Sequence, residues 1–155
     1  MIRIIVFSVI IMMIPAACLA DGRLERCEPY RHEVQSILVL NGVSAGYYYL
    51  MVAESGCRIG AVSNRGAVGF WQMTKSTMTH YGCNRADDVI CQTHAAGRYI
   101  KHLSKRFNDD DIIFAWNMGG SNYRRIGKPT KEAVGLLKTF KKLQQTGSGT
   151  TDNPG

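Results

Sequence analysis

The sequence contains no apolar run long enough to span a lipid bilayer. The stretch Ile4 to Ile14 is 11 residues long, whereas a membrane-spanning helix needs about 20. Arg3 precedes this run, and Cys18 and Ala20 place small residues where a signal peptidase cleaves. The pattern predicts that residues 1–20 are a secretory signal peptide and that the protein is exported. An uncleaved anchor and a lipoprotein attached through Cys18 are the alternatives.

The sequence also lacks a long basic block, although 19 Lys and Arg outnumber 12 Asp and Glu. The formal net charge of +7 falls by one, to +6, if Arg3 is removed with the signal peptide. A basic exported protein tends to associate with anionic material such as nucleic acid, anionic lipid or acidic cell-wall polymer. The positive residues are dispersed and not interleaved with aromatic residues, so we expect no nucleic-acid partner. Their one looser cluster is Lys138, Lys141 and Lys142.

Cysteines are few, and four of the five lie outside the predicted signal peptide. An even number in a small exported domain predicts two disulfides, with three possible connectivities. Cys83 and Cys91 would close a short polar loop, and this favoured pair leaves Cys27 with Cys57. The alternative is a zinc site that uses cysteines and His94. No tight CxxC spacing supports zinc in an oxidising compartment, so we expect neither a metal nor a cofactor.

No internal repeat, second domain or clear alternating strand pattern is present. Hydrophobic content of 45% suffices for one packed core. The sequence therefore predicts one mainly helical domain over residues 21–145, followed by a disordered tail over residues 146–155. Helices are expected over 31–40, 45–54, 74–81, from Asp87-Asp88 to about Phe107, from 108–111 to Gly119-Gly120, and over 130–143.

Three segments carry the residues that could perform chemistry. They are Glu54-Ser55, the glycine-rich stretch 63–72 (SNRGAVGFWQ) and residues 115–119 (AWNMG). Taken singly, each has an ordinary explanation: a solvated glutamate, turn glycines and a helix end. Their order and spacing resemble the lysozyme-like soluble lytic transglycosylases, which share a fold with goose-type lysozymes. The FWQ variant and the Thr-x-x-x-Tyr-Gly that follows it are most similar to the membrane-bound transglycosylase D branch.

The resemblance covers about residues 42–127 and implies a mainly α, lysozyme-like domain that cleaves peptidoglycan glycan strands. Glycosidic cleavage normally takes two carboxylates, yet the sequence offers no second acid in a comparable motif. One carboxyl suffices if N-acetylmuramic acid supplies its 2-acetamido group to stabilise the oxocarbenium-like centre and its C6 hydroxyl to attack C1. Glu54 would then act first as acid and next as base. Its apolar neighbours should raise its pKa from about 4.3 toward 6 or more.

The resemblance also implies which residues contact the substrate. Ser55 would hydrogen-bond near the catalytic carboxyl or the glycan, and the small residues of the second segment would let the backbone approach the glycan. Gln72 and Asn117 would orient acetamido and hydroxyl groups, while Trp71 is expected to pack beneath the cleft. The implied substrate-binding residues are Ser55, Ser63, Gly66, Ala67, Gly69, Gln72, Trp116 and Asn117.

Two positions depart from the family pattern. Trp116 stands where the family usually has tyrosine, so it either stacks on a sugar or packs as a core aromatic residue. A final Glu-Thr-x-x-Tyr-Val motif is degenerate here, with Leu136 at the tyrosine position. Either another hydroxyl therefore supports Glu54, from Tyr123 or one of the residues 47–49, or its pKa is set mainly by burial.

Two other functions stay open at this point. A goose-type muramidase would hydrolyse the same bond with water, and a catalytically idle protein would only bind the wall or act as a scaffold. Small exported members of the family often open the wall locally for secretion, conjugation or pilus machinery. By that analogy we expect a periplasmic location and components of an envelope-spanning apparatus as further partners.

Overall fold

The computed structural model describes residues 22–149. The predicted signal peptide (residues 1–20) and the end of the predicted tail (150–155) lie outside the described residues. Within residues 22–149, no helix is both long and apolar enough to cross a membrane. This part of the chain is mainly helical, as the sequence predicts, with one small two-stranded sheet.

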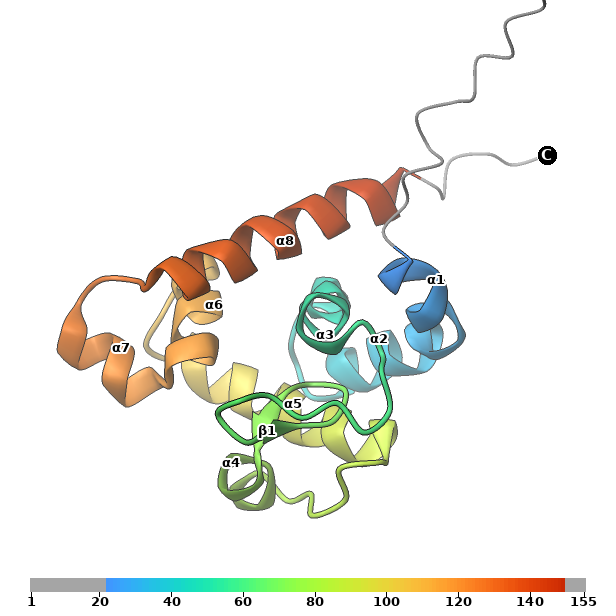
Figure 1. The fold of residues 1–155 in the computed structure, drawn as a ribbon, viewed down its shortest axis with the longest axis horizontal. Coiled ribbons are helices and arrows are strands. Elements are labelled where there is room, and N and C mark those ends of the chain that lie inside the picture. Colours follow the sequence, from blue (N-terminus) through green and yellow to red (C-terminus); the bar gives the residue numbers. More distant parts are fainter. Residues whose placement is uncertain (1–21, 150–155) are drawn as a thin grey trace, which may run out of the picture.

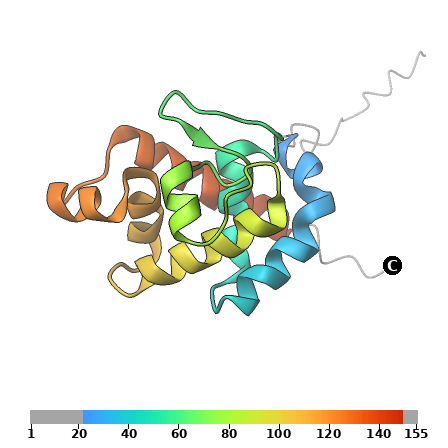
Figure 2. The same ribbon diagram turned by 90° about the horizontal axis from the view of Figure 1, so that it is seen from below.

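The helix α3 (Tyr48–Ser55) runs through the middle of the molecule (Figure 1). The longer helices α2, α5, α6 and α8 lie around it; α8 packs against α3 and α6, and α2 packs against α5. Figure 2, seen from below, shows α5 crossing the molecule between α7 and α1. The bounds of these four helices are α2 Arg31–Leu40, α5 Val89–Ser104, α6 Asp109–Met118 and α8 Lys131–Ser148.

Shorter elements connect these helices. At the N-terminal end, α1 (Arg23–Cys27) is followed by a 3₁₀ turn at Glu28–Tyr30, and a second 3₁₀ turn at Ala45–Tyr47 leads into α3. After α3 come a loop and the antiparallel strands, with Ala67 opposite Thr74 and Val68 opposite Met73. The remaining elements are β1 Ala67–Val68, β2 Met73–Thr74, α4 Lys75–His80 and α7 Gly120–Ile126.

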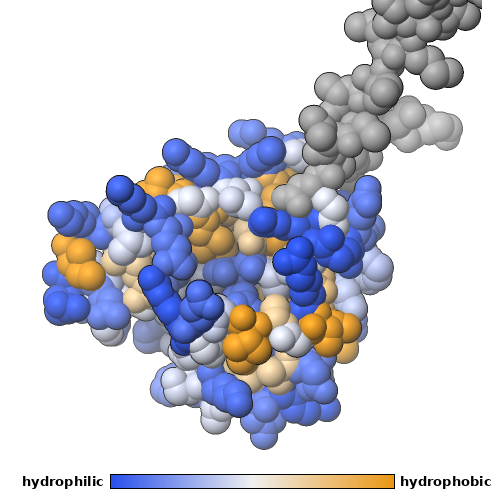
Figure 3. All heavy atoms as spheres, in the orientation of Figure 1, coloured by the Kyte–Doolittle hydropathy of each residue, from blue (hydrophilic) through white to orange (hydrophobic). Residues whose placement is uncertain are grey.

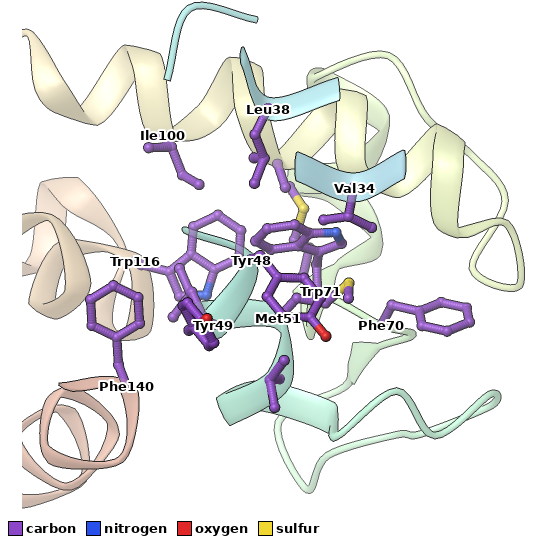
Figure 4. Close-up of a cluster of buried hydrophobic side chains, with 14 of the residues drawn as sticks. Val34, Leu38, Tyr48, Tyr49, Met51, Phe70, Trp71, Ile100, Trp116 and Phe140 are labelled. Carbon is purple, nitrogen blue, oxygen red and sulfur yellow. The ribbon is translucent and has the colours of Figure 1, made fainter. Parts of the chain in front are cut away.

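The sequence of α3 explains its central position. Every residue from Tyr48 to Val52 is buried, and a helix that is apolar all round must lie inside the protein. Ser44 begins the preceding turn, because its side chain accepts a hydrogen bond from the Gly46 N–H. Gly56 ends the helix in the left-handed conformation, with φ of 57°. Figure 4 shows this core, in which Tyr48 and Met51 lie among Trp71, Trp116 and Ile100.

Besides α1, which was not predicted, three features differ from the expected elements. The last helix continues to Ser148, so the first residues of the expected disordered tail are helical; the Arg31 guanidinium holds this end by donating to the Gly147 carbonyl at 3.2 Å. The small sheet lies in a region expected to be a loop. Helix α7 was not expected, because it begins with glycine and has few apolar residues; the rings of Phe107 and Phe114 pack against its Tyr123.

Both disulfides are the favoured pairs. Cys27–Cys57 joins α1 to the second residue after the end of α3, and Cys83–Cys91 joins the loop after α4 to α5. Cys27, Cys57 and Cys83 are buried in the core. A disulfide of this kind typically contributes about 2–4 kcal/mol to stability. The first one therefore holds the C-terminal end of α3, where Glu54 lies.

Candidate active site

Glu54 lies in the last turn of α3 and meets Trp116 from α6. The indole Nε1–H of Trp116 donates a hydrogen bond to Oε1 of Glu54 at 2.9 Å. Trp116 is only 7% exposed and packs against the rings of Trp71 and Tyr99, with centroid separations of 5.9 and 5.3 Å. The donor is thus held by packing on both sides, which fixes the carboxyl group that it contacts.

Burial raises the pKa of Glu54 to about 7. The hydrogen bond from Trp116 acts in the opposite direction, because it stabilises the ionised carboxylate. The negative charge of Glu132, at the start of α8, raises the pKa further. Burial is the largest of these three effects. The apolar surroundings therefore leave both the protonated and the ionised form of the carboxyl group populated near neutral pH.

Within residues 22–149, the side-chain hydrogen bond to Glu54 comes from an indole N–H and not from any of the candidate tyrosines, Tyr47 included. Tyr123 donates its hydroxyl proton to Oδ1 of Asp111 at 2.6 Å. The hydroxyl of Tyr49 accepts from Arg31 at 3.0 Å, and the hydroxyl of Tyr48 is buried with no hydrogen-bond partner among residues 22–149. Trp116 is thus both a packed core aromatic residue and the contact to the carboxyl group.

Hydrogen bonds from two sides hold the end of α3 that carries Glu54. Ser55 Oγ donates to the Phe70 carbonyl at 2.7 Å and accepts from the Cys57 N–H at 3.0 Å, so it ties the helix end to the segment after β1. Guanidinium groups from α1 cover free carbonyls at the helix end, where positive charge is favoured. These are Arg23 to the Ala53 carbonyl (3.3 Å) and Arg26 to the Gly56 carbonyl (3.1 Å).

The polar residues of the glycine-rich segment bond mainly to their own loop. Ser63 Oγ accepts from the Ala67 N–H at 3.1 Å, next to the β-hairpin. Gln72 has φ of 49°, and its Nε2 donates to the carbonyls of Ala61 (3.1 Å) and Gly69 (2.9 Å). The Gln72 amide nitrogen thus closes the loop. The amide oxygen of Gln72 makes neither of these two hydrogen bonds and remains for a ligand.

The two glycines of this segment have different surroundings. Both have positive φ of 75°, but a Cβ on Gly66 would meet open space. A Cβ on Gly69 would lie 2.5 Å from the Gln92 amide and 2.6 Å from the Ala86 carbonyl. Gly69 is therefore required by packing inside the protein, whereas Gly66 leaves the loop surface clear.

Beneath this segment lies a buried polar pair on α5 that the sequence analysis did not single out. Gln92 and Thr93 are fully buried, and Thr93 Oγ1 accepts from the indole N–H of Trp71 at 2.9 Å. Gln92 accepts from the Trp71 backbone N–H at 3.3 Å. Trp71 is 0% exposed and packs in the core. Gln92 lies four residues before Ala96, on the apolar face of its helix. Its position on that face was the feature of the sequence that could have indicated a buried polar side chain.

Two further polar side chains belong to the candidate segments. Asn117 follows Trp116, and its Oδ1 is buried without a hydrogen-bond partner in the described chain. Arg65, in the loop before β1, forms an ion pair with Glu132 of α8 at 2.7 Å. The pair joins the two sides of the face on which α3 ends, where the surface recedes between α8 and the loop (Figure 3).

A cavity of about 870 Å³ lies between α4, α5 and α7. Tyr99, whose ring packs on Trp116, forms part of its wall, and so does Gly120 just after the AWNMG segment. Pockets of this size hold small-molecule or saccharide ligands. Within residues 22–149, no group of three or more His, Cys, Asp or Glu is placed to hold a metal ion.

Comparisons with known proteins show the family of the chain. A protein of Alteromonas sp. (strain M-1), named "Putative tributyltin chloride resistance protein", is 27% identical over 128 residues, which cover 77% of this chain and 62% of that protein. The chain thus spans less than two thirds of that relative's length. No solved structure matches the chain. The family model "Transglycosylase SLT domain" matches residues 41–136, more than half of the chain. The chain therefore belongs to the lytic transglycosylase family, with a lysozyme-like, mainly α transglycosylase SLT domain.

Proposed function

We propose that the protein is a peptidoglycan lytic transglycosylase that uses Glu54 as its single acid and base. It would cleave the β-1,4 bond between N-acetylmuramic acid and N-acetylglucosamine. The observation that carries the proposal is the Glu54 carboxyl group, buried enough to have a pKa of about 7 and fixed by the Trp116 N–H at 2.9 Å. Such a group is protonated in a large fraction of molecules near neutral pH and can give up its proton.

The reaction follows from these two states of Glu54. The protonated carboxyl gives its proton to the glycosidic oxygen as the bond from that oxygen to muramic C1 breaks. The substrate's 2-acetamido group stabilises the positive charge that develops at C1. The carboxylate of Glu54 then takes the proton from the C6 hydroxyl, and O6 bonds to C1, which leaves a 1,6-anhydromuramic end. Every proton released is accounted for by one carboxyl group.

A second carboxylate for the usual two-acid mechanism has little support. Glu132 is the acid whose charge acts on Glu54, but its side chain is 56% exposed and paired with Arg65 at 2.7 Å. An exposed, paired carboxylate is a poor nucleophile or base. The unpartnered Oδ1 of Asn117 is an acceptor for the N–H of an acetamido group, which supports its role in orienting the substrate.

The decisive experiment compares wild type with Glu54→Gln on purified sacculi, with mass spectrometry of the released muropeptides. Wild type should release anhydro ends, and the variant should lose activity by about 10³-fold or more because a general acid contributes roughly 10²–10⁴-fold and the same group also serves as base. Glu33→Gln, on the exposed face of α2, is the matched control and should retain activity. Thermal melting verifies that both variants fold.

Other outcomes would give other functions. Reducing ends in place of anhydro ends would identify a muramidase that uses water. Full clearing by Glu54→Gln would contradict the assignment of the acid. A wild-type protein that binds sacculi but releases nothing would be a wall-binding scaffold.

The location and biological use of the activity are part of the same proposal. We infer that residues 1–20 direct export to the periplasm and that the enzyme opens the wall locally for a secretion, conjugation or pilus apparatus. The signal-like pattern of residues 1–20 supports the export step. Cell fractionation with and without these residues tests the export step, which retention of the full chain in the cytoplasm would contradict.

A further inference from the structure

The cavity beside Trp116 has charged groups of only one sign in its wall. Arg106, just after α5, lines it together with Arg124 and Arg125 of α7. His80 and His102 also line it, and none of the described aspartates or glutamates does. Hydrophilic residues cover most of the outer surface of α7 in Figure 3 as well. A cavity with this lining attracts an anionic group.

These guanidinium groups are not used to hold the fold by ion pairs. Within residues 22–149 the ion pairs join Glu28 to Arg31, Glu132 to Arg65, Asp88 to Arg85 and Asp110 to Lys141. Arg106 and Arg124 take part in none of them, and Arg125 donates to the amide oxygen of Asn122 at 3.4 Å. Both Arg106 and Arg124 are exposed to solvent. Their donors are therefore available to a ligand.

The rest of the wall suits a sugar. Tyr81 and Tyr99 lie ring against ring at 5.0 Å, and the hydroxyl groups of Ser76, Thr77 and Ser121 are spread around them. Aromatic faces with a few hydroxyl groups pack and hydrogen-bond a saccharide ring. Tyr99 also packs on Trp116, which donates to Glu54, so the cavity lies close to the proposed cleavage site. The cavity is thus lined both by groups that suit a sugar and by cationic groups.

We propose that this cavity recognises the carboxylate on the O3 side arm of a muramic acid residue near the one that is cleaved. The inference rests on the proposed function and adds a substrate preference to it. Arginine binds carboxylates in a bidentate manner, with strong charge-assisted hydrogen bonds, so Arg106 and Arg124 are the residues that provide the preference. The carboxylate belongs either to the free lactyl group of a strand without peptides or to the attached peptide.

Binding to Glu54→Gln tests the preference without cleavage. Isothermal titration compares peptide-bearing strands, naked strands, naked strands whose carboxylates have been converted to amides, and chito-oligosaccharides. Arg106→Gln/Arg124→Gln should weaken binding of carboxylate-bearing strands by about 10- to 100-fold, because hydrogen bonds to charged groups contribute roughly 1.5–3 kcal/mol. It should leave the amidated strands and chito-oligosaccharides within about twofold. A loss seen with naked strands identifies the lactyl carboxylate, and a loss seen with peptide-bearing strands alone identifies the peptide.

The matched control is Lys138→Gln/Lys142→Gln, which removes the same charge from the exposed side of α8. This control should bind every strand as tightly as its parent. An equal loss in the control, an equal loss for amidated strands, or no preference for carboxylates in the parent would each overturn the proposal. Cleavage by the Glu54→Gln parent would instead contradict the proposed function, so the two failures are distinguishable.

Discussion

The surroundings of Glu54 and the neighbouring cavity differ in how they affect charged groups. Around Glu54 the protein excludes water, so the carboxyl group keeps its proton up to about pH 7. In the cavity, exposed guanidinium groups remain charged and without ion-pair partners among residues 22–149. Trp116 and Tyr99 separate the two regions by one pair of packed rings. In the proposed mechanism, the chemistry therefore takes place at a buried carboxyl group, and the substrate preference comes from exposed charged groups.

The largest effect should come from removing the buried ionisable group, Glu54, and should appear in the pH dependence of stability. The pKa of Glu54 is about 7 in the folded protein against an ordinary value of 4.5, so its burial costs nothing below pH 4.5 and destabilises the fold as the pH rises to 7. The stability of Glu54→Gln relative to wild type should therefore be roughly 3 kcal/mol greater at pH 8.5 than at pH 4.

Chemical denaturation of both proteins at the two pH values measures this change. The same curves for Glu33→Gln show what removal of an exposed carboxylate does. A stability difference between wild type and Glu54→Gln that does not change with pH would mean that Glu54 is not held in an apolar wall.

The next largest effect should come from the group that fixes the carboxyl. Trp116→Phe keeps an aromatic ring but removes the N–H, so kcat/KM should fall by about 10- to 100-fold, the equivalent of a hydrogen bond to a charged group. The hydrogen bond lowers the pKa of Glu54, so its loss should also move the upper limb of the pH profile to higher pH.

Trp71→Phe is the matched control, because its indole N–H bonds to Thr93 and not to Glu54. It should lower stability but leave the pH profile in place. A profile that shifts equally in both variants would show that Trp116 acts through packing alone.

The sequence predicts one half of this site better than the other. Glu54 and its apolar wall follow from the buried run 48–52, because a helix that is apolar on all sides can only lie in the core. The sequence does not predict the partner of Glu54. Trp116 stands where the family has tyrosine, and the sequence leaves open whether the Trp116 side chain faces a sugar or the carboxyl group. That choice depends on the contact between α3 and α6, residues 62 positions apart in the chain.

The same limit explains the elements and residues that were missed. Helix α7 and the end of α8 are held by tertiary contacts, such as Arg31 to the Gly147 carbonyl, which local periodicity does not encode. Gly69 has the sequence signature of a loop glycine, and only the structure shows Gln92 against it. The cationic cavity is assembled from residues in α4, after α5 and in α7, so their charges look dispersed along the sequence.

The third prediction is that the rate and the binding affinity depend differently on pH. Above pH 7, kcat/KM should fall about tenfold per pH unit, because the acid form of Glu54 is depleted. Binding of carboxylate-bearing strands to Glu54→Gln should stay constant from pH 7 to 9, since arginine side chains keep their charge over this range. Parallel rate and titration measurements test this directly. If affinity and rate fell together, the loss of rate would reflect substrate binding and not the acid.

The smallest effect concerns the ion pair between the loop and α8. Glu132 raises the pKa of Glu54, so Glu132→Gln should lower that pKa and move the upper limb of the pH profile to lower pH. Arg65→Gln should move it to higher pH, because the charge of Glu132 is then no longer offset. Both side chains are more than half exposed, so solvent screening limits each shift to a few tenths of a pH unit. Shifts of the same sign in the two variants would show that the ion pair acts by holding the loop in place, and only opposite signs assign the effect to charge.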